Sequence, residues 1–211
     1  DNEEEDDIGD KEEEINEEEY RRSIEETLSD DEKLERKEKA QVLKDEGNRL
    51  FRLGNYTEAL EQYSEALNIC PYSFPKERSI MFSNRGACQM KLENNEEGIK
   101  DCSSAIELHP HYVKAILRRA ELYEKTEKLD EALADNQKAV ELDPSQTKAR
   151  ITAMKLSEEI KDRNEKMKTE MLGKLKDLGN LVLKPFGLST DNFQLAQNPD
   201  TGSYSVNFKQ N

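Results

Sequence analysis

The sequence predicts an all-α fold, in which three helical hairpins stack into an α-solenoid and a long helix caps the C-terminal end of the stack. Three observations predict this fold. A segment ending in Ala and Pro recurs three times, small residues recur at matched places within each copy, and a long amphipathic stretch follows the last copy. Because one hairpin cannot bury its own apolar face, the copies need neighbours and a cap.

The repeat is visible when three stretches are aligned: NYTEALEQYSEALNICP, NNEEGIKDCSSAIELHP and KLDEALADNQKAVELDP. Their alanines fall in one column and their final prolines in another, with steps of 39 and then 34 residues. The aligned positions are Ala66, Ala105 and Ala139, and Pro71, Pro110 and Pro144. The five extra residues of the first step fit in the connection YSFPKER, where an insertion costs little.

This pattern resembles the tetratricopeptide repeat, whose unit is an antiparallel helix pair with small residues where the helices cross. The resemblance covers residues 40–144. It implies a right-handed α-solenoid of three repeats, at residues 40–73, 79–112 and 113–146. Small side chains let two helices approach closely, and a proline ends the second helix of each repeat. The small positions are Gly47, Gly86 and Ala120 in the first helices and Ala59, Gly98 and Ala132 in the second.

The repeats predict first helices near residues 40–53, 77–92 and 112–125, and second helices near 56–69, 95–108 and 129–142. Residues 145–183 are predicted to form a long capping helix that covers the third repeat. Its second half carries an apolar stripe with a near-heptad spacing, formed by Ile160, Met167, Met171, Leu175, Leu178 and Val182. Two alternatives remain open: the stripe packs on the protein's own surface, or it pairs with another chain, including self-association through Ile160 to Val182.

An acidic tail precedes the repeats. Residues 1–39 hold 20 acidic and 7 basic residues, and their apolar groups are too few to offset the entropy of ordering the backbone. The tail is therefore predicted to be largely disordered, with helix possible near the repeats. Ser29 is followed by three acidic residues, so it is a candidate phosphorylation site for kinases that prefer acidic flanks; the alternative is an unmodified, solubilising tail.

A second tail, residues 184–211, follows the long helix. The alternation of Tyr204, Val206 and Phe208 is compatible with a short strand or with an extended arm that docks on the repeats, and disorder is the default expectation for a chain end. No role is assigned to this tail.

Composition narrows the class of function. The 211-residue chain has a formal net charge of −15 and no basic block, which argues against a nucleic-acid partner. No signal-peptide-like run or apolar stretch of membrane-spanning length is present, so no membrane insertion is predicted. Cys70, Cys88 and Cys102 form an odd set without a CxxC pair, which favours the reducing cytoplasm. The chain begins with Asp1 rather than Met and is expected to be a fragment.

Enzymatic signals are weak in this sequence. His109 and His111 flank a proline in a turn without a Cys or His cluster beside them, so no metal site is predicted. Phosphate-binding GxxxxGK[ST] and nucleophile GxSxG motifs are both absent. We expect no catalytic residues and no cofactor.

The candidate binding residues lie on the first helices, which line the concave wall of this type of superhelix. Members of the family that act as co-chaperones carry a carboxylate clamp there, and its five positions match residues in LKDEGN, MFSNRG and VKAILR. They are Lys44, Asn48, Asn84, Lys114 and Arg118. The two residues of each pair, Lys44 with Asn48 and Lys114 with Arg118, are four apart and so share one helix face.

A peptide that ends in Asp presents two carboxylates, and each needs cationic or amide donors. By resemblance, the expected ligand is the C-terminal Glu-Glu-Val-Asp motif of the seventy- and ninety-kilodalton heat-shock chaperones. Phe51 and Ala87 are candidates for a neighbouring apolar pocket, with inter-repeat packing as the alternative. The sequence thus predicts a peptide-binding co-chaperone adaptor that also binds a second, unidentified protein. The alternative is a general scaffold or signalling adaptor whose groove or C-terminal helix binds another partner.

Overall fold

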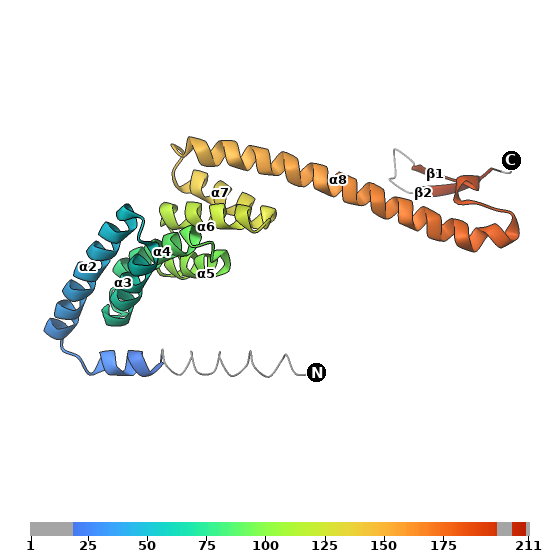
Figure 1. Ribbon diagram of the computed structural model, residues 1–211. Coiled ribbons are helices and arrows are strands. Elements are labelled where there is room, and N and C mark those ends of the chain that lie inside the picture. Colours follow the sequence, from blue (N-terminus) through green and yellow to red (C-terminus); the bar gives the residue numbers. More distant parts are fainter. Residues whose placement is uncertain (1–18, 198–203, 210–211) are drawn as a thin grey trace. The chain divides into compact units, whose positions relative to one another are not determined.

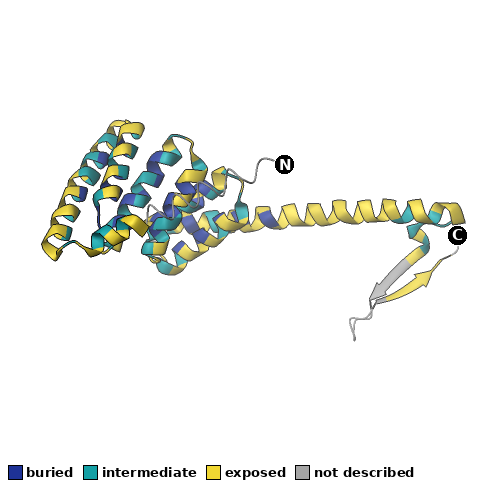
Figure 2. Ribbon diagram, turned by 90° about the horizontal axis from the view of Figure 1, so that it is seen from below, coloured by how far each residue is buried: buried dark blue, intermediate teal, exposed yellow. Residues whose placement is uncertain are grey.

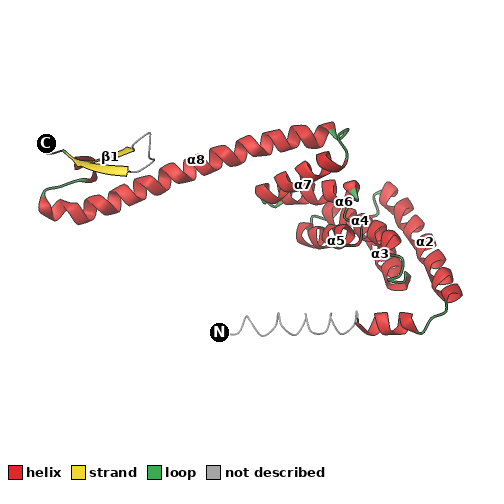
Figure 3. Ribbon diagram, turned by 180° about the vertical axis from the view of Figure 1, so that it is seen from behind, coloured by secondary structure: helices red, strands yellow, loops and turns green. Residues whose placement is uncertain are grey.

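The computed structural model describes residues 19–197 and 204–209, and they form three stacked helical hairpins, a long helix and a small β-hairpin (Figures 1 and 3). The hairpins pack in chain order. They are α2 (Asp30–Leu53) with α3 (Tyr56–Ile69), α4 (Pro75–Lys91) with α5 (Asn95–Leu108), and α6 (Val113–Lys125) with α7 (Leu129–Leu142). Helix α8 (Thr147–Leu183) follows. The predicted solenoid of three hairpins and a long C-terminal helix is confirmed.

The second helices α3, α5 and α7 begin and end at the predicted residues, but two first helices begin earlier than predicted. Helix α2 begins at Asp30 because Ser29 and Glu32 form a capping box, in which the Ser29 hydroxyl accepts a hydrogen bond from the Glu32 N–H. Residues 30–39 are therefore helical, in line with the helix that the sequence allows next to the repeats. Helix α4 begins at Pro75, within the predicted connection, since proline fits the first turn of a helix.

A short helical stretch at residues 19–26 packs against the far end of the first repeat. The Glu25 carboxylate accepts hydrogen bonds from the backbone N–H groups of Tyr72 (2.6 Å) and Ser73 (2.9 Å), and the Arg22 guanidinium lies 4.3 Å from the centre of the Tyr72 ring. This part of the acidic tail is therefore ordered as well. Residues 1–18, the rest of the predicted disordered tail, lie outside the described residues.

Small residues sit at the helix crossings, as the repeat pattern predicts. All six are buried in the structure. A Cβ atom added at Gly47 would lie 2.8 Å from the Tyr63 ring, and one added at Gly86 would lie 3.2 Å from the backbone oxygen of Gly98. Side chains at these crossings would hold the helices apart.

Replacing Gly47 with Ala should destabilise the protein by about 1–3 kcal/mol, because the new methyl group overpacks the Tyr63 ring. Urea unfolding followed by circular dichroism measures this. Gly173→Ala is the matched control: it lies in α8 with no atom within 4 Å of the added Cβ, so it should leave stability unchanged or raise it slightly. Equal effects of the two substitutions would contradict the crossing role of Gly47.

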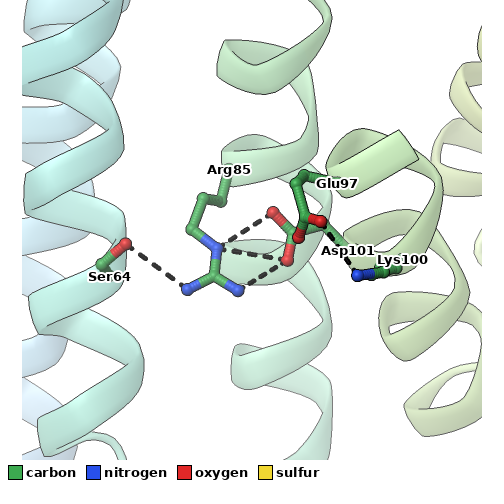
Figure 4. Close-up of polar contacts among 5 residues, drawn as sticks. All are labelled: Ser64, Arg85, Glu97, Lys100 and Asp101. Carbon is green, nitrogen blue, oxygen red and sulfur yellow. Dashed lines mark hydrogen bonds and ion pairs between the residues drawn. The ribbon is translucent and has the colours of Figure 1, made fainter. Parts of the chain in front are cut away.

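An ion pair with a buried aspartate joins the two helices of the second repeat, and its arginine also donates to a serine of the repeat before it (Figure 4). The Arg85 guanidinium on α4 donates to both Asp101 carboxylate oxygens on α5, at 2.6 and 2.9 Å, and reaches Ser64 on α3 at 3.4 Å. The same arrangement recurs in the next repeat, where Arg119 donates to Asp135 (2.7 and 2.9 Å) and to Ser103 (3.0 Å). The repeat therefore includes a polar link that fixes how successive hairpins stack.

Helix α8 spans two compact units, residues 1–156 and 157–211. Its apolar face repeats every 11 residues rather than every seven: Ala149, Ile160, Met171 and Val182 form one series. Along this face Ala149, Leu156 and Ile160 are buried, whereas all the residues from 161 to 178 are exposed (Figure 2). The predicted near-heptad spacing and this 11-residue period share the same steps of three and four residues. Both alternatives for the stripe, packing on the protein's own surface and pairing with another chain, stay predictions.

The C-terminal tail folds against the end of α8. Two 3₁₀ turns, Lys184–Phe186 and Thr190–Asn192, lead into strand β1 (Phe193–Gln197), which pairs antiparallel with β2 (Tyr204–Phe208). The Asn180 side-chain oxygen accepts hydrogen bonds from the backbone N–H and the hydroxyl of Thr190, at 2.7 and 2.9 Å. The strand alternative is therefore the one observed, and disorder was the wrong default for residues 184–197 and 204–209.

Three further sequence expectations can be compared with the structure. Within residues 19–197 and 204–209, no helix has both the length and the apolar character needed to cross a membrane. Among the same residues, no three His, Cys, Asp or Glu side chains lie close enough together to hold a metal ion. All three cysteines are buried free thiols, and burial raises the pKa of Cys88 and of Cys102 to about 12.

Candidate functional site

The candidate site lies on the first helices, with α4 packed between α2 and α6. Each of these helices presents one or two of the predicted polar residues about one turn apart. Asn48 on α2 and Asn84 on α4 are in direct contact, since the Asn84 amide nitrogen donates to the Asn48 side-chain oxygen at 3.1 Å. The first two repeats thus meet at a pair of amides.

Arg118 extends this network to the third repeat. From α6, its guanidinium donates to the Ser83 hydroxyl at 2.6 Å and to the Ser83 carbonyl oxygen. Ser83 is the neighbour of Asn84 on α4, so the pairs Asn48–Asn84 and Arg118–Ser83 meet at adjacent residues of that helix. They form a polar chain across three helices that is joined by the backbone of α4, not by a hydrogen bond between the two pairs. The arrangement places a cation and two amides at adjoining positions, as a carboxylate ligand requires.

Lys44 and Lys114 flank this chain without a recorded hydrogen bond to its three members. The Lys44 ammonium is held by Gln41, to which it donates at 3.0 Å, and it lies 3.7 Å from an Asp45 carboxylate oxygen. Lys114 is exposed, one turn before Arg118, and both line a cavity of about 300 Å³. The structure therefore brings two of the five predicted residues, Asn48 and Asn84, into direct contact, and it bonds Arg118 to Ser83, the residue next to Asn84. Lys44 and Lys114 lie one helical turn from Asn48 and Arg118.

The two residues predicted for an apolar pocket, Phe51 and Ala87, are packed between helices. Ala87 is only 5% exposed, which favours packing over a role in a surface pocket. Phe51 is partly buried, and its ring meets the Tyr56 ring edge-on at 5.1 Å between centres. Both residues contribute to the packing between α2, α3 and α4 rather than forming an open pocket.

Sequence reasoning missed the residues that hold the polar chain in place. The Tyr63 hydroxyl on α3 donates to the Asn48 oxygen at 2.8 Å, and burial raises the pKa of Tyr63 to about 12, which keeps it a donor at neutral pH. Ser83 holds Arg118 in the same way. No signal in the sequence links Tyr63 to Asn48, because the contact crosses between two helices.

Lys148 is a further cation that the sequence analysis overlooked. It lies in the first turn of α8 and lines the same cavity as Lys114 and Arg118, together with Glu121 and Glu124. The sequence does contain a signal for this residue, because Lys148 follows Lys114 by 34 residues, which is the length of one repeat. The capping helix α8 thus adds a fourth helix to the surface that the three first helices form.

A second cavity, of about 420 Å³, lies between α3, α4 and α5 and has several arginines in its wall. Arg78 and Arg85 in this wall have structural partners: Arg78 donates to the carbonyl oxygens of Leu67 and Cys70, and Arg85 binds Asp101. These bonds hold the end of α3 and the contact between repeats, so this cavity is a weaker candidate for a ligand site.

Comparison with known proteins agrees with the repeat pattern. A family model described as "TPR repeat" matches residues 47–74, and one described as "Tetratricopeptide repeat" matches residues 89–147. The mitochondrial import receptor subunit TOM70 of Rattus norvegicus is 40% identical over 88 residues. That match covers 42% of this chain and 14% of TOM70, so the similarity spans only a small part of that curated relative.

Solved structures match over most of their own length. The first TPR of Spaghetti (RPAP3), bound to the HSP90 peptide SRMEEVD, is 31% identical with a TM-score of 0.54, and the match covers 58% of this chain and 94% of that one. The second TPR domain of human RPAP3, in complex with the HSP70 peptide SGPTIEEVD, is 30% identical with a TM-score of 0.51, covering 56% and 94%. From these matches and the three stacked hairpins, the chain belongs to the tetratricopeptide repeat family of protein-interaction modules.

Proposed function

We propose that this protein is a co-chaperone adaptor that binds the C-terminal Glu-Glu-Val-Asp motif of heat-shock chaperones through Lys44, Asn48, Asn84, Lys114 and Arg118. The observation that carries the proposal is that two hydrogen-bonded pairs, Asn48 with Asn84 and Arg118 with Ser83, meet at adjacent residues of α4. Related domains that bind HSP90 and HSP70 peptides support the ligand class. We place the protein in the cytoplasm, where its buried thiols stay reduced.

In the proposed complex, the amides of Asn48 and Asn84 and the cationic groups share the two carboxylates of the terminal Asp. The Asn48 oxygen accepts from Tyr63 and Asn84, and the Asn48 NH₂ group donates to an Asp45 carboxylate oxygen at 3.4 Å. Because that bond is long, the NH₂ group can turn to a ligand carboxylate at small cost. Asn84 and Arg118 already have partners in the absence of peptide, so binding replaces or shares those bonds. The ion pair between Lys44 and Asp45 is long, so Lys44 can turn to a peptide carboxylate at small cost.

The identity of the protein within the family is also a proposal. The chain as a whole, including the segment KPFGLSTDNF, resembles tetratricopeptide repeat protein 1, a small member of the family. The adaptor is proposed to bind a second protein as well. Phosphorylation of Ser29 stays a prediction, and its hydroxyl is the N-cap of α2.

The test is a calorimetric titration of the full chain with Met-Glu-Glu-Val-Asp as the free acid and as the C-terminal amide. Amidation removes one carboxylate and its charge-assisted hydrogen bonds, worth roughly 1.5–3 kcal/mol each, so affinity should fall about tenfold or more. Equal affinity for the two forms would reject the clamp. Titrations with SRMEEVD and SGPTIEEVD then show which chaperone's peptide binds more tightly.

Replacing Lys148 with Ala should weaken binding of the longer peptides more than binding of the pentapeptide. Lys148 lines the cavity beyond Lys114, and an acidic ligand gains from each added cation within a Debye length. The ratio of the two affinities, measured for wild type and variant, checks this. Lys155→Ala, a change on the same helix at an exposed position, is the control and should leave the ratio unchanged.

A further inference from the structure

The distal part of α8 presents an apolar surface that the described residues leave uncovered. We call it the distal stripe, formed by Met167, Met171, Leu175, Leu178 and Val182, each of which is more than half exposed. At about 3.6 residues per turn these side chains lie on one face of the helix. Contiguous apolar surface of this kind is rare on monomeric proteins and marks an interaction site.

The C-terminal tail does not cover this face. It contacts α8 through Lys176, whose ammonium lies 2.7 Å from an Asp191 carboxylate oxygen, through Gly179, and through Asn180. An α-helix turns by about 100° per residue. Lys176 and Asn180 therefore lie on the side of α8 opposite to Met171, and Gly179 lies at the edge between the two sides. The tail therefore packs on the polar side and leaves the stripe open.

The spacing of the stripe is symmetric. From Ile160 to Val182 its positions are separated by steps of 4, 3, 4, 4, 3 and 4 residues, with Asn164 as the one polar member, and the pattern reads the same in both directions from Met171. Two copies of this helix that run antiparallel about a two-fold axis at Met171 thus place Met171 opposite Met171, whereas Leu178 faces Asn164 and Val182 faces the buried Ile160 of the second copy. Met167 then faces Leu175 of the second copy.

The charges beside the stripe fit the same arrangement. In an antiparallel pair, each flank of one helix faces the same flank of the other. With Met171 at the centre, Lys174 of the second copy lies two residues from the level of Glu170, and Asp177 of the second copy lies two residues from the level of Arg163. A parallel pair places Lys161 opposite Arg163 but also Glu170 opposite Lys168, so the spacing of the stripe, and not charge alone, favours the antiparallel pair. Residues 157–183 carry six acidic and six basic residues, so they have no excess positive charge that would favour an anionic membrane.

From these observations we propose that the distal stripe is a homodimer interface, in which two α8 helices pair antiparallel with Met171 at the two-fold axis. The interface is isologous, so each chain supplies the same surface. A dimer carries two peptide-binding sites on one particle. This inference does not depend on the proposed ligand, because no clamp residue takes part in the interface.

The test measures the mass of the full chain by analytical ultracentrifugation at tens of micromolar. Wild type should sediment with twice the 24.4 kDa chain mass, and Met171→Glu should sediment as a monomer, because it places two carboxylates at the axis. Thr169→Glu adds the same charge to the opposite face of α8 and should remain dimeric. A monomeric wild type, or a dimer that survives Met171→Glu, would overturn the proposal.

A charge exchange tests the antiparallel orientation. Glu170→Lys and Lys174→Glu should each weaken the dimer by about tenfold, and the double variant should recover wild-type affinity, since the opposed pair is restored with its signs reversed. In a parallel pair Glu170 faces Lys168 of the second copy, so the double variant would stay weak, and that result would reject the antiparallel arrangement. Circular dichroism of each variant shows that α8 remains helical.

Discussion

Lys114→Ala should lower the affinity for Met-Glu-Glu-Val-Asp by about tenfold or more, because one charge-assisted hydrogen bond to the terminal Asp is lost. Lys114 suits this test, since it is exposed and its removal leaves the core of the repeat intact. Arg118 is less suitable, because it also holds Ser83 on the neighbouring helix. Calorimetry with the free-acid peptide measures the change.

Lys125→Ala is the matched control for Lys114→Ala. Lys125 lies on the same helix, is also exposed, and is the last residue of that helix, about three turns from Lys114 and outside the set of residues that line the cavity. The control should bind peptide as wild type does. If both substitutions weaken binding equally, the effect is one of general charge, and the specific role of Lys114 is contradicted.

Arg85→Met should destabilise the fold by roughly 3–5 kcal/mol, because it leaves the Asp101 carboxylate buried without its cation. Asp101 is only 5% exposed, and burial raises its pKa above the usual value even though the hydrogen bonds and charge of Arg85 act in the opposite direction. Equilibrium urea unfolding measures the loss. A loss below about 1 kcal/mol would contradict the structural role of this pair, since such a value is typical of an exposed ion pair.

Two comparisons separate loss of the charge partner from general damage to the core. The double variant Arg85→Met with Asp101→Leu removes both charges and should recover much of the lost stability. The penalty of the single variant should also be larger at neutral pH than at mildly acidic pH. Without Arg85 the pKa of Asp101 rises further, so the carboxyl takes up a proton as the pH falls, and protonation removes the cost of the buried charge.

The sequence predicted the hairpins well because the repeat period reports tertiary packing directly. Gly47, Gly86 and Gly98 recur where helices cross, and the structure has no room there for a side chain. The same argument explains why the second helices matched to the residue, since both of their ends are set by the repeat. The start of α2 was missed because it depends on a local cap at Ser29, outside the repeat.

The polar residues of the candidate site were predictable by position, but their partners were not. Asn48, Asn84 and Arg118 follow from the repeat alignment, whereas Tyr63 and Ser83 act through contacts between helices that only coordinates show. The buried pairs of Arg85 with Asp101 and Arg119 with Asp135 repeat at 34 residues and were open to detection. Charged residues that recur along a sequence are usually taken to lie on the protein surface, whereas the aspartates of these two pairs are buried.

The most direct test of the account is a crystal structure of the chain with Met-Glu-Glu-Val-Asp. The account predicts that both carboxylates of the terminal Asp lie within hydrogen-bonding distance of the Asn48 and Asn84 amides and of the cationic groups of Lys44, Lys114 and Arg118. A peptide bound elsewhere, or bound along these helices with its terminal carboxylates away from the two amides, would contradict it.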